Sequence, residues 1–128
     1  MIAAYVHIYW VDLANTRRCR IVPVEYFITL MGHAKRPGVN IAKVGMGLVY
    51  LIPSEGFSGV GEYLYTLDPS SMRILRGVGF GDVLGVFGRF EEKAAGVANG
   101  VEVGLCPRTV LGKIVEYVDG FRLVSLSF

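Results

Sequence analysis

Two alternating stretches joined by a short polar segment open the chain, in the sequence YVHIYWVDLANTRRCRIVPVEYF (residues 5–27). In the first stretch Val6, Ile8 and Trp10 alternate with more polar neighbours, which predicts a strand with one buried face. The segment DLANTR supplies the turn, because Asp and Asn side chains satisfy turn backbone locally. The alternation then resumes and ends at Pro23, a residue confined to the ends and edges of strands. The chain therefore begins with a β-hairpin.

The remaining sequence predicts further strands and two helices within one domain. A short helix at 24–31 follows the hairpin, and the glycine-rich segment 35–61 predicts a long irregular connection. The strongest helical pattern covers 106–118, with Pro107 in its first turn and Gly120 as its stop. The other expected elements are strands at 62–67, 72–75 (pairing back) and 82–90, a turn at 68–71, a loop at 91–104 and a strand-like tail at 121–128. We therefore expect an α+β, β-grasp-like fold: a mostly antiparallel twisted sheet packed on one or two helices.

Composition indicates a protein that does not act alone. Hydrophobic residues make up 52% of the 128 residues and charged residues 19%, and the mean hydropathy is +0.47. Surplus apolar surface of this kind is usually covered by a partner or by another domain. The net charge of +2 is too small to favour nucleic acid or an anionic membrane as that partner.

The sequence favours a cytoplasmic location. The longest uncharged apolar run, 44–53, is too short to cross a bilayer, and the N-terminal MIAAYVHIYW lacks the basic n-region of a signal peptide. Cys19 and Cys106 are the only cysteines. Because they lack metal-ligand spacing, they fit a reduced intracellular protein better than a disulfide scaffold.

No constellation of residues assembles an active site. His7 and His33 have no second ligand at metal spacing, and structural roles fit them better. The segment GVGFGDVLG (77–85) approaches a dinucleotide fingerprint, but Asp82 replaces the third glycine and no helix is expected after it. Adjacent acidic residues diverge on a strand, so no carboxylate pair suggests itself for acid–base work. The scattered acidic residues considered are Asp12, Glu25, Glu62, Glu91 and Glu92.

Three arginines near two aromatic residues raise the alternative of single-stranded nucleic-acid binding. Arg17, Arg18 and Arg20 follow Tyr9 and Trp10 closely, and such proteins stack bases on aromatic side chains in a basic groove. Because adjacent strand residues point to opposite faces, Arg17 and Arg18 do not share a surface unless the turn reorients one. We therefore expect arginines that are solvated or that pair with carboxylates of a partner.

The opening stretch resembles the N-terminal β-grasp segment of glutamine synthetases. In that family a strand with an aromatic residue and an Asp turns into a second strand, which ends in a Pro and a helix. Here Trp10-Val11-Asp12 and Arg20-Ile21-Val22-Pro23 carry the likeness, which is greatest to the glutamine-synthetase-like proteins of fungi. The likeness continues in order, over roughly residues 4–121, through KRPGVNIAKVGMG, GEYLYTLDPSSMRIL and RFEEKAAG…GLCPRTVLGKIVEYV.

Two shorter motifs are similar to family motifs at the corresponding places. Leu67-Asp68-Pro69-Ser70-Ser71 loosely resembles a P-D-x-S-T/S turn after a late strand of the β-grasp domain. Cys106-Pro107-Arg108 resembles the D/C-P-R that opens the helix leading into the family's catalytic domain. The colinear order of these motifs, more than any one of them, carries the resemblance.

The resemblance implies a place in glutamine biosynthesis and nitrogen metabolism. Family members are ligases that make glutamine from glutamate, ammonia and ATP, with Mg or Mn bound by glutamates in a C-terminal barrel. Their β-grasp domain packs against a neighbouring subunit in a ring and closes that subunit's active site. The partners implied here are a homo-oligomer or full-length glutamine-synthetase-like subunits, with no nucleic acid and no membrane. The implied interface residues are Trp10, Asp12, Arg18, Arg20 and Asn40.

Three departures limit what the resemblance implies for catalysis. The family's ammonium-binding latch aspartate is missing from RPGVNIAKVGMG, where Asn40 is the nearest polar substitute. The segment RGVGFGDVLGVFGRF replaces a link that contains proline and histidine in the family. In GFRLVSLSF, Arg122 and Val124 stand where metal-binding glutamates are expected, and such side chains do not hold a divalent ion.

We therefore expect residues 1–119 to form the β-grasp-like domain and 120–128 to be an aberrant start of a catalytic domain that is missing. This chain is expected to hold no ATP or metal site and to be inactive in isolation, as a truncated, frameshifted or degenerate fragment. The alternative is a non-catalytic β-grasp module for protein interaction.

Overall fold

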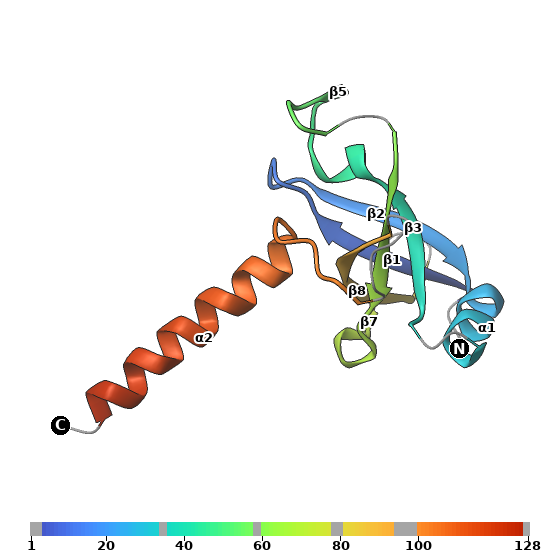
Figure 1. Cartoon of the computed structure of the whole chain (residues 1–128). Helices are drawn as coiled ribbons and strands as arrows, with labels where there is room; N and C mark the ends of the chain where they lie inside the picture. The colour runs from blue at the N-terminus through green and yellow to red at the C-terminus, as the bar shows by residue number, and fades with distance from the viewer. Residues whose placement is uncertain (1–3, 34–35, 58–59, 78–80, 94–99, 127–128) are drawn as a thin grey trace.

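The chain folds into a curled sheet, with a short helix near the start of the first strand and a long helix that extends away from the sheet (Figure 1). The computed structural model describes residues 4–33, 36–57, 60–77, 81–93 and 100–126. The helices are α1 (Val24–His33) and α2 (Pro107–Leu126), with short 3₁₀ turns η1 (Lys43–Met46) and η2 (Pro69–Ser71). The strands are β1 (Tyr5–Val11), β2 (Arg17–Pro23), β3 (Gly38–Ala42), β4 (Leu48–Val49), β5 (Ile52–Pro53), β6 (Glu62–Leu67), β7 (Arg73–Leu75) and β8 (Val83–Glu92).

The main sheet has the strand order β2-β1-β8-β6-β3, and β7 adds to β8. β1 pairs antiparallel with β2, as the predicted hairpin, and parallel with β8. β6 pairs antiparallel with both β8 and β3. The α+β class and the mostly antiparallel sheet are therefore confirmed.

The core lies on the inner face of the curled sheet. Val6, Ile8 and Trp10 are buried on β1, as their alternation predicted. The two edge strands, β2 and β3, approach each other. Nη1 of Arg20 on β2 donates to the backbone carbonyl of Asn40 on β3 at 2.5 Å. The other buried hydrophobic residues are Val22, Phe27, Val39, Ile41, Met46, Tyr63, Tyr65, Leu67, Val86, Phe90, Val103 and Cys106.

The prediction of an irregular connection at 35–61 is wrong for much of that segment. Gly38–Ala42 forms β3, an edge strand of the main sheet, and β4 and β5 form a small hairpin of their own. Val39 and Ile41 are buried with 5% and 3% exposure, so an alternating pattern was present. It is short, and the surrounding glycines and prolines obscured it.

The predicted pairing of 72–75 back onto 62–67 is also wrong. β7 pairs with β8 instead, with Ile74 opposite Leu84. The cause lies in the turn η2, where the hydroxyl of Ser71 donates to the carbonyl of Phe87 at 3.1 Å and accepts from its N–H at 2.9 Å. These bonds attach the turn to β8, so the chain after it continues along β8.

The C-terminal helix is longer than the sequence predicted. Gly120 was expected to end it, and residues 121–128 were expected to form a strand, but α2 continues through Gly120 to Leu126. An internal glycine costs a helix only about 1 kcal/mol and does not by itself end one. The expected domain boundary at 119/120 therefore falls inside α2, and residues 127–128 lie outside the described residues.

Candidate interaction surface

The turn between β1 and β2 is organised by the carboxylate of Asp12, which is 2% exposed. Its Oδ1 accepts hydrogen bonds from the backbone N–H groups of Ala14 at 2.9 Å and Thr16 at 2.8 Å. Its Oδ2 accepts from Nε of Arg18 at 2.7 Å. Within this turn Asn15 has a φ of 60°, a conformation that Asn tolerates better than most residues. Asp12 and Arg18 therefore hold the turn in one shape.

Trp10 connects the same end of β1 to the following segment of the chain. It is 8% exposed, and its indole N–H donates to the carbonyl of Gly45 at 3.1 Å. Its ring lies 6.1 Å from that of Tyr65, between centroids. Trp10 thus fixes η1 and the β4–β5 hairpin that follows it relative to the main sheet.

The predicted interface residues form two groups in the structure. Trp10, Asp12 and Arg18 lie together at the turn end of the hairpin, whereas Arg20 meets the Asn40 backbone between the edge strands. Because Trp10 and Asp12 are buried, any part they take in an interface is as supports for the turn. Their interface role stays a prediction.

Arg17 and Arg18 of β2 form contacts within the chain. Arg18 pairs with Asp12, and the Arg17 guanidinium lies 5.5 Å from the centroid of the Tyr9 ring. For Arg18, this corrects the expectation of solvation or of a partner's carboxylate. Arg17 and Arg18 do not form a common basic surface, so the nucleic-acid alternative gains no support.

The second buried carboxylate is also held by an arginine. Glu91 is 5% exposed, and its Oε2 accepts from Nε of Arg36 at 3.0 Å while Oε1 accepts from Nη2 of the same side chain. The hydrogen bonds to Glu91 and its negative charge raise the pKa of the Arg36 guanidinium. Glu91 is therefore engaged in tying β8 to the segment before β3, an arrangement that favours structure over acid–base chemistry.

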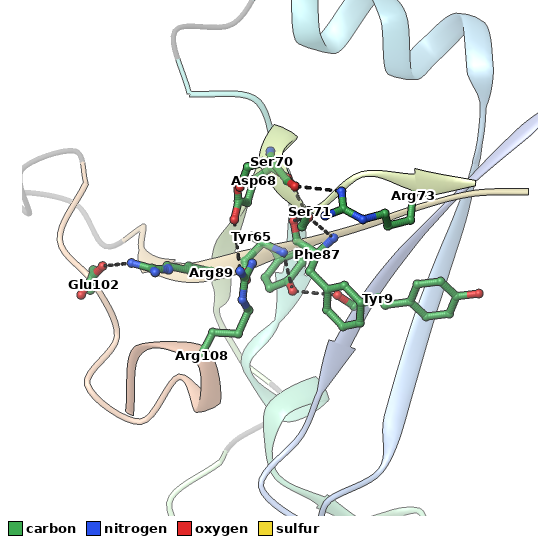
Figure 2. Close-up of polar contacts among 11 residues, drawn as sticks. Tyr9, Tyr65, Asp68, Ser70, Ser71, Arg73, Phe87, Arg89, Glu102 and Arg108 are labelled. Atoms are coloured by element: carbon green, nitrogen blue, oxygen red, sulfur yellow. Dashed lines mark hydrogen bonds and ion pairs between the residues drawn. The ribbon is translucent and has the colours of Figure 1, made fainter. Parts of the chain in front are cut away.

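A polar junction centred on Tyr65 joins β6, β8 and β1 (Figure 2). Its hydroxyl donates to the carbonyl of Tyr9 at 2.7 Å and accepts from the N–H of Gly88 at 2.8 Å. Tyr65 is 1% exposed, and burial raises the pKa of its phenol far above the usual value, with the bond from Gly88 acting in the opposite direction. The hydroxyl is therefore protonated at neutral pH and donates to the Tyr9 carbonyl.

A second group of contacts attaches the start of α2 to the turn after β6. Nη2 of Arg108 donates to Oδ2 of Asp68 at 3.1 Å, and its Nη1 donates to the carbonyl of Gly88 at 3.3 Å. Oδ1 of Asp68 accepts from the hydroxyl of Ser70 at 2.6 Å and from its backbone N–H at 3.0 Å. The hydrogen bond from the Ser70 hydroxyl lowers the pKa of the Asp68 carboxyl, and the bond from Arg108 lowers it by a smaller amount. Figure 2 shows Arg108 directed from α2 toward Asp68.

Beside these contacts lies a mostly apolar cavity of about 240 Å³. It opens between β1, β6 and β8 on one side and the first turns of α2 on the other. The buried thiol of Cys106 lies in its wall, where Sγ accepts from the N–H of Phe90 at 3.4 Å. The lining residues are Trp10, Val11, Tyr65, Phe87, Gly88, Phe90, Cys106, Pro107, Arg108 and Leu111.

The helix α2 carries a broad apolar stripe that the described residues do not cover. At 100° per residue, the apolar residues from Val110 to Phe121 fall within one half of the helix, and the polar residues Lys113, Glu116 and Asp119 of this stretch lie outside that stripe. All are substantially exposed, from 40% at Val110 to 70% at Tyr117. The stripe consists of Val110, Leu111, Ile114, Val115, Tyr117, Val118 and Phe121.

A second exposed apolar surface lies at the tip of the β4–β5 hairpin. Val49, Tyr50, Leu51 and Ile52 follow one another, and Tyr50 and Leu51 are 92% and 91% exposed. The hairpin base is closed by Ser54, whose N–H and hydroxyl both donate to the carbonyl of Gly47, at 2.8 Å and 2.6 Å. The tip projects from the sheet (Figure 1) and presents its apolar residues to solvent.

The described residues contain no group of three or more His, Cys, Asp and Glu placed to hold a metal ion. Nor is any helix among them long and apolar enough to cross a membrane. The glycine-rich segment 77–85 includes positions 78–80, which lie outside the described residues. Comparison of the sequence with known protein families and with curated proteins found no match to either.

The parts that the sequence analysis missed are the Tyr65 junction, the Asp68–Arg108 pair and the cavity. Asp68 and Arg108 were noted only within short motifs, and no sequence pattern indicates that these two residues, 40 positions apart, form a contact. The alternation of 62–67 placed Tyr65 on a buried face, but its hydrogen-bond partners depend on the order of the strands in the sheet. The periodicity of the stripe predicted the helix α2, but it did not indicate that the stripe is exposed.

Proposed function

We propose that this chain is a non-catalytic subunit-interaction domain of the glutamine-synthetase kind, which packs against synthetase subunits and closes a neighbouring active site. Three features of the fold support it: an opening hairpin, a helix after it, and a late strand that returns parallel to β1. A β-grasp domain combines these features. The resemblance in sequence order supplies the family.

The observation that carries the proposal is the apolar tip of the β4–β5 hairpin. Exposed apolar patches of this kind mark interaction sites on soluble proteins. Here Ser54 closes the base of the hairpin and Trp10 bonds Gly45 in the preceding η1. The tip follows directly on RPGVNIAKVGMG (36–47), the stretch that resembles the family's latch loop. Tyr50 and Leu51 are the residues we expect to enter the neighbouring subunit.

The proposal assigns no catalysis to the isolated chain. The ATP, glutamate and Mg or Mn sites belong to the partner's barrel, and the buried carboxylates here, Asp12 and Glu91, are each paired with an arginine. A γ-glutamyl hydroxamate assay with Mg or Mn should give no turnover by the pure chain. Turnover that depends on the metal would contradict this part of the proposal.

The same proposal gives the chain a cytoplasmic location and a role in glutamine biosynthesis through its partner. Cys19 and Cys106 are both free thiols, as is usual in reducing compartments. A full-length fungal glutamine synthetase is the partner to test.

Co-elution tests the proposed partner directly. On size-exclusion chromatography, a mixture with full-length synthetase should carry the chain in the synthetase peak, and Leu51→Ser should abolish this. Ile74→Ser is the matched control, because Ile74 is an exposed apolar residue on β7 with 61% exposure, away from the tip. A chain that elutes alone in every mixture would contradict the proposal and leave the degenerate-remnant alternative.

A further inference from the structure

The apolar stripe of α2 and the cavity beside its first turns lie on the same part of the molecule. Leu111 belongs to both, since it is part of the stripe and lines the cavity. α2 contains 20 residues and is therefore about 30 Å long. One continuous apolar surface thus runs from the wall of the sheet along α2, with no covering element among the described residues.

The cavity is large enough for an aromatic ring from another chain. It measures about 240 Å³, whereas an apolar cavity of about 150 Å³ already holds a benzene molecule. Its walls include the rings of Trp10, Phe87 and Phe90, and aromatic side chains pack favourably on one another. Phe121, with 59% exposure and its ring 4.9 Å from that of Tyr117, is the exposed aromatic residue farthest along the described stripe.

The position of Phe121 on α2 matches an antiparallel pairing of two copies. Phe121 lies about 21 Å along the helix axis from Pro107. If two α2 helices pack antiparallel about a two-fold axis near Ile114, Phe121 of one copy lies level with Pro107 of the other. Pro107 and Leu111 line the cavity, so the ring of Phe121 reaches its opening.

We propose that two copies of this chain associate through antiparallel α2 helices, with Phe121 of each copy filling the cavity of the other. Such a contact is isologous, as two-fold symmetric dimers require. It goes beyond the proposed binding to synthetase subunits, because it uses α2 and leaves the β4–β5 tip free. Each of the two proposals can therefore be contradicted without affecting the other.

The available apolar area suits this pairing. A standard interface buries about 800 Å² on each partner. The seven side chains of the stripe, at their observed exposures, offer on the order of 600 Å², and the cavity walls add to this.

The first test measures the mass of the chain in solution. Light scattering coupled to size-exclusion chromatography should give twice the 14.0 kDa chain mass, and Phe121→Ala should weaken the dimer at least tenfold. Ile28→Ala is the control, because Ile28 is 63% exposed on α1 and should leave the dimer unchanged. A monomeric wild-type chain across a wide concentration range, or a dimer indifferent to Phe121→Ala, would overturn the proposal.

The second test uses the native thiol of the cavity as a reporter. In a Cys19→Ser, Phe121→Cys variant, diamide should link the new thiol to Cys106 of the other copy. The two thiols lose two protons and two electrons, which diamide takes up as it is reduced, and one S–S bond forms. Covalent dimers that disappear on adding Cys106→Ala support the arrangement. Dimers that form equally without Cys106 would show 121-to-121 contact, which contradicts the antiparallel register.

Discussion

The hydroxyl of Tyr65 on β6 donates a hydrogen bond to the backbone carbonyl of Tyr9 on β1 at 2.7 Å, although β8 lies between these two strands in the sheet. The same hydroxyl accepts from Gly88 on β8 at 2.8 Å. One side chain therefore connects three strands on the buried face. This contact keeps the sheet curled beside the cavity and the start of α2.

Tyr65→Phe should destabilise the protein by about 1–3 kcal/mol, because a buried N–H and a buried carbonyl lose their partner while the ring remains. Urea unfolding followed by circular dichroism measures the change. Tyr26→Phe, at a half-exposed tyrosine on α1, is the control and should be nearly neutral. Equal stability of both variants would show that the Tyr65 hydroxyl does not support the sheet.

Gly88→Ala should be strongly destabilising, by about 3 kcal/mol or more on the scale of large single-residue effects. A Cβ at position 88 would lie 2.2 Å from the carbonyl oxygen of Thr66, which is backbone and cannot rotate away. Gly112→Ala on α2 provides the contrast, since nothing lies within 4 Å of the added atom. There the change should stabilise the protein by about 0.5–1 kcal/mol through helix propensity. Thermal unfolding of the two variants in opposite directions is the expected result.

Asp68 predicts a specific pH dependence. Its pKa is lowered in the folded state, so its bonds to Ser70 and Arg108 stabilise the protein above the unfolded carboxyl pKa of about 3.9. That contribution, less than about 1 kcal/mol for so accessible a pair, is lost as pH falls through the folded pKa. Asp68→Asn should therefore lower stability at pH 7 and match the wild type in strong acid. A difference that persists unchanged at pH 2 would rule out ionisation as its cause.

Asp12→Ala should destabilise the hairpin turn by on the order of 2–4 kcal/mol, because two backbone N–H groups and the Arg18 guanidinium lose a buried partner. Asp12→Asn keeps an acceptor oxygen for the backbone and should cost less. Hydrogen exchange at Ala14 and Thr16 reports the turn directly, and both amides should exchange faster in the Ala variant. Unchanged protection would mean that the turn does not depend on this carboxylate.

The local sequence predicted β1, whereas the pairing of β7 and the end of α2 were predicted wrongly. The alternation of Val6, Ile8 and Trp10 identified β1 and its buried face without further information. The partner of β7 could not be identified in this way, because Ser71 selects β8 through contacts 16 residues away. Gly120 was predicted to end the helix from its residue type alone. A glycine does not end a helix unless the backbone leaves the helical conformation there, and in α2 it does not.

The candidate surface was less predictable than the fold. The apolar excess in the composition indicated that something covers this chain, and the structure locates that excess on α2 and on the β4–β5 tip. Their exposure depends on how the helix leaves the sheet, which is a long-range property. Trp10 and Asp12 were predicted to lie at an interface, but their side chains are internal because Gly45 and Arg18 bind them.

Sedimentation velocity of the chain, labelled at its N-terminus, tests most directly whether it is an interaction domain. The chain should sediment faster than a 14.0 kDa monomer as its concentration rises, and should move with full-length glutamine synthetase when the two are mixed. A single monomer boundary at every concentration, unchanged by the synthetase, would contradict the account.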